Sequence, residues 1–229
     1  MMVYMEKLLK RFAFIGVFVL LTATVKAVSV NLHSSNVGIG GMTWSISGAN
    51  IRVWENWTVS AKGILVISGL DAFQNYCVTK YIVNNTGVNW DHFANELLDP
   101  SGNLNDYRFD IPKEPWVPAG FSHSNNRDLL SFAQGSGIPR TSSAFSSIVV
   151  DELAGKDFLD FYGGSVSGAG GRDTVSFGLS DYHPFKNEPF LLSQRPNVYT
   201  TNGPIPEPTT MILFGLGLAG IAIRNRFKK

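Results

Sequence analysis

The chain has 229 residues, of which 44% are hydrophobic and 12% aromatic, a composition that supplies a packed core and argues against a disordered protein. Its formal net charge of +1 hides an uneven distribution, because residues 28–208 hold eleven Lys and Arg against seventeen Asp and Glu, a net charge of −6. An acidic body repels phosphate backbones, so we expect no nucleic-acid partner. The single cysteine, Cys77, excludes a disulfide within the chain, and we expect it to be a small apolar residue in a strand.

Residues 1–27 have the features of a secretory signal peptide. Lys7, Lys10 and Arg11 make a positively charged start, and residues 12–23 form an uncharged run dominated by apolar side chains. This run is short for a membrane span, which needs about 20 residues. We therefore expect the secretion machinery to recognise a signal helix here and signal peptidase to cut after Ala27. An uncleaved anchor is the alternative.

From Val28 onward, short runs of β-branched and aromatic residues alternate with clusters of Gly, Asn, Ser, Asp and Pro. This spacing is typical of many short strands joined by turns. Only residues 90–98 suggest a short helix. We therefore predict an all-β domain over residues 28–199, an antiparallel β-sandwich of jelly-roll type. The predicted strands cover residues 28–32, 42–47, 50–60, 63–68, 76–84, 107–110, 128–132, 146–151, 157–163, 173–179 and 190–194.

Two of these strands are predicted to form a hairpin. In residues 174–179 the apolar residues Val175, Phe177 and Leu179 alternate with small or polar ones, as expected for a strand with one buried face. A glycine-rich link over residues 168–171 joins this strand to residues 157–163. A flexible link between two short strands favours an antiparallel hairpin.

One face of residues 50–60 is a candidate glycan-binding surface. Trp54 shares this face with Arg52 and Asn56, whereas the opposite face is apolar apart from Glu55. Aromatic rings stack on the apolar faces of sugars, while guanidinium and amide groups bond the hydroxyls. The alternative is that Trp54 packs under a loop or against a second sheet, and the high average burial of tryptophan favours this alternative.

The sequence contains no recognisable catalytic or metal-binding motif. Its histidines lack the spacing of metal ligands, and no serine lies in a Gly-x-Ser-x-Gly turn. Asp91 with His92, and Asp157 with Asp160, are the pairs that folding would have to bring together for acid–base chemistry. We expect a non-enzymatic protein without cofactor or metal, with a polysaccharide hydrolase as the less favoured alternative. The scattered histidines are His33, His92, His123 and His183.

The last twenty-four residues follow a spacer over residues 200–205 and have three parts in a fixed order. Residues 209–223 carry no charge and predict a single transmembrane helix of about 22 Å, short against a hydrocarbon core of about 30 Å. Basic flanks stay on the cytoplasmic side, so the body would face outward. The apolar segment follows the tripeptide Pro206-Glu207-Pro208 and precedes the basic residues Arg224, Arg226, Lys228 and Lys229.

This tail, residues 206–229, resembles the PEP-CTERM sorting signal of exported bacterial proteins. The resemblance implies recognition by an exosortase, cutting at or near Pro206-Glu207-Pro208, and removal of the tail. The precursor would be held in the inner membrane and the product placed on the cell surface or in the extracellular matrix. Retention of the tail as an anchor is the alternative.

The resemblance carries no activity to the body, because the bodies of such proteins are diverse. The family typically occurs in bacteria that make extracellular polysaccharide. We therefore expect a structural or adhesive role in exopolysaccharide or biofilm. A carbohydrate-binding module is the alternative, with extracellular polysaccharide as its partner.

Overall fold

The computed structural model of the protein describes residues 27–100, 116–124, 128–151, 156–182 and 188–197. The predicted signal peptide, the strand at 107–110, the spacer and the sorting signal lie outside these residues. Every described strand lies between Ser29 and Pro196, so a fragment of residues 28–205 contains all the described strands of both sheets. The part of the chain that is described holds no helix with the length and apolar character that crossing a bilayer demands.

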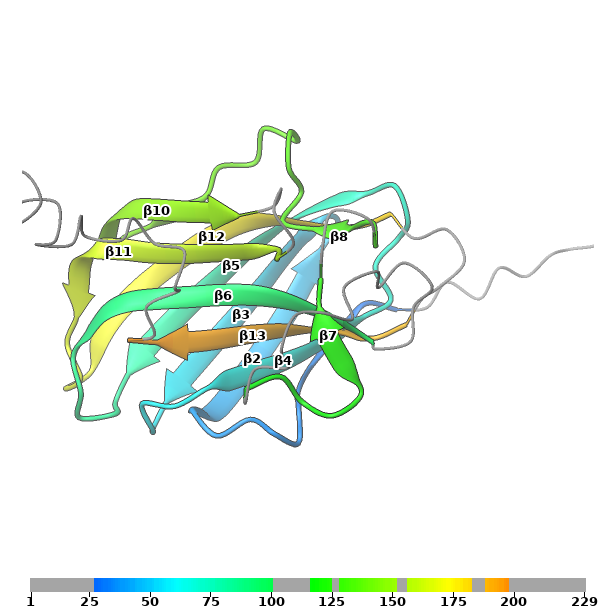
Figure 1. Ribbon diagram of the computed structural model, residues 1–229. Helices are drawn as coiled ribbons and strands as arrows, with labels where there is room; N and C mark the ends of the chain where they lie inside the picture. Colours follow the sequence, from blue (N-terminus) through cyan, green and yellow to red (C-terminus); the bar gives the residue numbers. More distant parts are fainter. Residues whose placement is uncertain (1–26, 101–115, 125–127, 152–155, 183–187, 198–229) are drawn as a thin grey trace, which may run out of the picture.

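The strands form two sheets that face each other across one hydrophobic core, as Figure 1 shows. The pairings among the described strands are antiparallel, except that β3 and β5 run parallel. The prediction of an all-β body is confirmed. The first sheet, sheet A, has the order β1 (Ser29–Leu32), β4 (Gly63–Ser68), β13 (Phe190–Pro196), β6 (Trp90–Pro100), β11 (Phe158–Val166) and β10 (Phe145–Asp151), with β7 (Phe121–His123) beside β6. The second, sheet B, has the order β2 (Ile39–Ser47), β3 (Asn50–Trp57), β5 (Asn75–Asn84), β12 (Gly171–Asp181) and β8 (Leu130–Ser131), with β9 (Thr141–Ser142) beside β12.

The predicted helix over residues 90–98 is wrong. This segment is the strand β6, which pairs with β11 on one side and with β13 on the other. Both of its faces are largely buried, because Phe93 and Leu97 enter the main core while Ala94 and Leu98 are covered on the outer side of sheet A. A strand buried on both faces does not alternate apolar with polar residues, and its pattern then resembles a helix.

The predicted hairpin between residues 157–163 and 173–179 is also wrong. The first segment lies in β11 of sheet A and the second in β12 of sheet B. The glycine-rich link carries the chain from one sheet to the other, and Gly170 has a φ of +86°, which glycine adopts without strain. The predicted inward residues Val175, Phe177 and Leu179 are buried, because each strand packs its apolar face against the shared core.

The core includes a cluster of three aromatic rings where β3 ends and β6 begins. Trp57 lies edge-on to both Trp90 and Phe93, with centroids 5.2 and 5.8 Å apart, and all three are fully buried. Such pairs contribute about 0.5–1.5 kcal/mol each beyond the area that they bury. A Cβ atom at Gly38 or at Gly63 would lie 2.4 Å from the Trp57 ring, so both positions require glycine.

A buried polar network crosses the same core and joins the two sheets. Lys80 of β5 lies 3.4 Å from Glu55 of β3, and both side chains have no exposed surface. The Lys80 ammonium also donates to Asn95 of β6, at 3.3 Å, and to Gln194 of β13. Gln194 in turn donates to Glu55 at 3.0 Å. Trp57 gives Glu55 a further hydrogen bond of 3.0 Å from its ring nitrogen.

This network explains why a carboxylate interrupts the apolar face of residues 50–60. Burial lowers the pKa of Lys80 to about 8, although the negative charge of Glu55 acts in the opposite direction. The ammonium also lies 4.6 Å from the centre of the Phe93 ring, whose face attracts a cation. Two strands from each sheet contribute polar atoms, so the network fixes how the sheets are placed on one another.

We predict that Lys80→Met lowers the free energy of unfolding by about 3–5 kcal/mol, because it leaves the Glu55 carboxylate buried without its cation. Urea unfolding of the 28–205 fragment measures this loss. The double variant Glu55→Gln/Lys80→Met keeps an acceptor for Trp57 and removes both charges, so it should be more stable than Lys80→Met alone. A double variant less stable than the single one would contradict this account of the network.

Candidate functional site

The outer face of sheet B carries the side chains that the sequence singles out. In β3 the exposed residues alternate strictly with buried ones, so Arg52, Trp54 and Asn56 all point away from the core. Trp54 is 41% exposed. The expectation that it packs under a loop or a second sheet is therefore wrong. The physical reason is that Val53 and Glu55 already occupy the inward positions on either side of it.

Strand pairing extends this face into rows that run across four strands. Because the register is regular, residues that are paired on β2, β3, β5 and β12 project from the same face. The central row contains both of the outward aromatic residues of β3 and β5, and the rows on its two sides each contain an arginine. The central row is Thr43, Trp54, Tyr81 and Thr174; one flanking row is Gly41, Asn56, Val83 and Arg172, and the other is Ser45, Arg52, Thr79 and Ser176.

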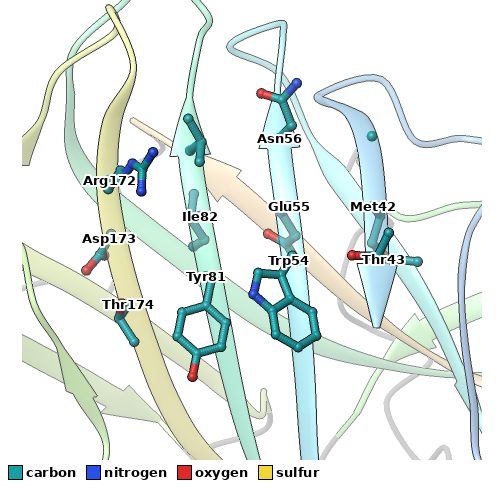
Figure 2. Close-up of a pocket in the computed structure, with 12 residues that line it drawn as sticks. Met42, Thr43, Trp54, Glu55, Asn56, Tyr81, Ile82, Arg172, Asp173 and Thr174 are labelled. Atoms are coloured by element: carbon teal, nitrogen blue, oxygen red, sulfur yellow. The ribbon is translucent and has the colours of Figure 1, made fainter. Parts of the chain in front are cut away.

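A groove of about 670 Å³ lies over the central row and the Arg172 row. The rings of Trp54 and Tyr81 have centroids 5.3 Å apart and planes that differ by 16°. Figure 2 shows both rings nearly face-on and beside one another over their two strands, with Asn56 and Arg172 at the same end of the groove. The two rings form a stacked pair that lines the groove, named here the aromatic platform.

Polar groups are placed beside the aromatic platform. The side-chain amide of Asn85, which follows β5, donates to Oδ1 of Asn56 at 2.7 Å. This bond orients the Asn56 side chain and leaves its NH₂ group to donate to a ligand. Thr43 and Thr174 add hydroxyl groups at the two ends of the central row. Stacking surface and hydrogen-bond donors therefore share one open groove.

Buried charges lie directly behind the groove. Glu55 follows Trp54 on β3, Lys80 precedes Tyr81 on β5, and both point into the core. Asp173 of β12 lies in the same inward row as Glu55, because both pair with Ile82 of β5, and it is 3% exposed. The Ser142 hydroxyl donates to its two carboxylate oxygens at 2.8 and 2.9 Å, and the backbone N–H groups of residues 143 and 144 donate to it at 3.0 Å. Each inward charge is held by several bonds, which fixes the outward side chain next to it.

The sequence alone predicted three residues of this face, Arg52, Trp54 and Asn56. Strand pairing between distant parts of the chain adds the others. Tyr81, Arg172 and Thr174 lie on strands whose order cannot be inferred from the spacing of residues. Alternation along residues 76–84 and 173–179 identifies which side chains point outward, but not that the two strands are neighbours. That signal would have listed Tyr81 and Thr174 as outward residues without placing them beside Trp54.

A second polar cluster lies on the outer face of sheet A and is covered by residues 116–124. Glu96 of β6 is 2.6 Å from the Arg195 guanidinium and contacts Nδ1 of His123, and the Trp116 ring nitrogen donates to it at 3.4 Å. Burial opposes the ionisation of Glu96, but the hydrogen bond from His123 and the charge of Arg195 outweigh it and lower its pKa. Arg195 also lies 4.2 Å from the centre of the Trp116 ring. These contacts tie the covering segment to the sheet.

The fold joins the two candidate acid–base pairs, because it places His92 of the first beside Asp160 of the second. His92 lies 3.1 Å from Asp160, and Asp157 instead accepts a hydrogen bond of 2.5 Å from Ser124. Burial raises the pKa of Asp160, against the lowering effect of the His92 hydrogen bond. Within the described ranges, no three His, Cys, Asp or Glu side chains converge as a metal site requires.

Cys77 lies in a strand, as predicted, but on the half-buried outer face of β5. Its sulfur is 3.7 Å from the Ser176 hydroxyl on the neighbouring strand. Lys80, the cation closest to it in sequence, points to the opposite face of the sheet. The sequence neighbour that would activate the thiol is therefore directed away from it.

Comparison with known proteins bears on the tail. Residues 204–226 match the PEP-CTERM protein-sorting motif. The match includes Pro206-Glu207-Pro208, the uncharged segment and the first two basic residues after it, Arg224 and Arg226. Searches of curated proteins and of solved structures found no match to the chain. The chain carries a PEP-CTERM sorting motif, which marks it as an exported protein with an exosortase as its processing partner.

Proposed function

We propose that the body of this exported protein binds extracellular polysaccharide through the outer face of sheet B. The observation that carries the proposal is the aromatic platform, two nearly parallel, stacked rings in an open groove. A protein placed on the cell surface that holds polysaccharide would have a structural or adhesive role in the matrix. Its role would be to hold the polymer in the matrix.

The chemistry of the groove suits a sugar. The C–H groups on one face of a pyranose ring are apolar and pack on an aromatic ring, while the hydroxyls at its rim need hydrogen-bond partners. Trp54 and Tyr81 supply the apolar surface, and Asn56, Thr43 and Thr174 lie around it. The groove is open along the sheet, which suits an extended polymer better than a small enclosed metabolite.

The outward side chains around the platform favour binding over hydrolysis. Glycoside hydrolysis uses two carboxyl groups that flank the bond to be cut. The outward residues of β2, β3, β5 and β12 in the three rows around the platform include no carboxylate. Glu55 and Asp173 point into the core, where their oxygens accept hydrogen bonds from protein groups. We therefore propose that the protein is a binder and not an enzyme.

The tail is proposed to act before the body does. Its uncharged segment of about 22 Å would hold the precursor in the inner membrane only poorly, which suits a transient anchor. The exosortase would then cut at or near Pro206-Glu207-Pro208 and remove the tail. Signal peptidase would already have removed residues 1–27 after Ala27. The released product would begin near Val28 and reach the surface or the matrix.

The variant Trp54→Ala should weaken binding to polysaccharide about tenfold or more, because a buried aromatic contact contributes about 1.5–3 kcal/mol. Glycan-array screening of the 28–205 fragment identifies the ligand, and calorimetry on that ligand measures the change. Phe73→Ala is the matched control, since Phe73 is an aromatic residue that is 74% exposed and contacts Tyr182 outside the groove. Equal losses in the two variants, or unchanged binding of Trp54→Ala to each glycan, would contradict the proposal.

The variant Glu207→Ala should block removal of the tail, because it deletes the charge in the motif that the exosortase recognises. Intact-protein mass measurement and membrane fractionation of the producing cells read this out. We expect a heavier product that stays in the membrane fraction. Glu188→Ala removes an exposed carboxylate from the body and should be processed normally. A Glu207→Ala protein with the same mature mass and release as the wild type would rule out exosortase recognition of the motif.

A further inference from the structure

The charges on the outer face of sheet B point to one class of polysaccharide. We propose that its ligand is an acidic polysaccharide whose uronate carboxylates bind Arg52 and Arg172 on the two sides of the aromatic platform. This inference rests on the proposed function, because it specifies the ligand of the same groove.

The face differs in charge from the rest of the body. Residues 28–208 carry a net charge of −6, yet the outward residues of β2, β3, β5 and β12 contain two arginines and no Asp or Glu. Of the acidic residues on these strands, Glu55 and Asp173 are turned into the core, and Asp181 is half-buried at the end of β12. The body is acidic as a whole, but this face carries cations and no outward carboxylate. Such a face is suited to an anionic ligand.

Both guanidinium groups are available to such a ligand. Arg52 and Arg172 are exposed, and neither forms an ion pair or a hydrogen bond with any described residue. In contrast, Arg195 on the other sheet is buried against Glu96 at 2.6 Å. The planar guanidinium group can bind a carboxylate through two parallel hydrogen bonds, which gives both strength and orientation.

The positions of the two arginines suit a chain rather than a single sugar. Arg52 lies in the row on one side of Trp54 and Tyr81, and Arg172 lies in the row on the other side and two strands away. With the usual strand rise and spacing, their Cα atoms are about 16 Å apart. One sugar ring is much shorter than this distance. A linear polymer that crosses the sheet diagonally would pack on the rings and present carboxylates to both guanidinium groups.

The test compares each polymer with its own uncharged form. The 28–205 fragment is titrated with polygalacturonate, alginate and hyaluronate, and with the same polymers after reduction of their carboxyl groups. We expect at least one acidic polymer to bind about tenfold or more tightly than its reduced form, as hydrogen bonds to charged groups allow. Added salt should weaken the binding of the acidic form and leave the reduced form nearly unchanged.

Variants then assign the preference to the two arginines. Arg52→Gln/Arg172→Gln should lower affinity for the acidic polymer to that for the reduced one and leave binding of the reduced polymer unchanged. Lys62→Gln, which removes a positive charge near His33 and outside the groove, is the control and should keep the preference. Unfolding midpoints equal to that of the wild type show that these surface changes leave the fold intact.

The outcomes separate this inference from the proposed function. Equal affinity for acidic and reduced polymers would overturn the acidic ligand and leave polysaccharide binding standing. A preference that survives in the double arginine variant, or is lost equally in Lys62→Gln, would overturn the assignment to Arg52 and Arg172. No binding to either form of the three polymers would overturn the acidic inference, while the glycan array with Trp54→Ala decides separately whether the protein binds polysaccharide.

Discussion

The rest of the structure depends on the buried ion pair between Lys80 and Glu55. Both charges have no exposed surface, and amide groups from the opposite sheet complete their hydrogen bonds. Because successive residues of a strand point to opposite faces, an inward Glu55 places Trp54 outward and an inward Lys80 places Tyr81 outward. A slip of one residue in β3 would bury Trp54 and expose the carboxylate. One interaction in the core therefore fixes the core contacts and the aromatic platform together.

The outer faces of the two sheets differ in how their charged residues are held. On sheet A, residues 116–124 lie over Ile64, Leu98 and Leu191, and the ion pair of Glu96 with Arg195 is buried beneath them. On sheet B, the platform and its neighbouring rows line a groove. Glu96 and Arg195 pair with each other on the first face, whereas Arg52 and Arg172 on the second form no ion pair with a described residue. We therefore propose that ion pairs within the protein stabilise the fold, and that Arg52 and Arg172 are left to bind a ligand.

Local patterns in the sequence predicted the class of fold and several strands with their inward and outward residues. The order of the strands, and therefore the neighbours of each residue, depends on pairing between distant parts of the chain. Alternation alone identified β3, the polar face that carries Trp54 and the anomalous Glu55, but the average burial of tryptophan favoured the wrong expectation that Trp54 is covered. Alternation did not show that Lys80 neutralises Glu55 or that Tyr81 lies beside Trp54, because both depend on the parallel pairing of β3 with β5. The same limitation produced the false hairpin of residues 157–163 with 173–179, and burial on both faces disguised β6 as a helix. The sorting motif was readable because it is a contiguous stretch of sequence.

The most direct test follows the NMR signals of the indole N–H groups of the five tryptophans. A polysaccharide that binds the 28–205 fragment is titrated into it. The account predicts that the Trp54 signal moves with the titration, because its ring is the contact surface. The signals of Trp57 and Trp90, fully buried in the core, should stay in place. A titration that leaves Trp54 unchanged, or that instead moves Trp116 in the segment covering sheet A, would contradict the central claim that the outer face of sheet B is the binding surface.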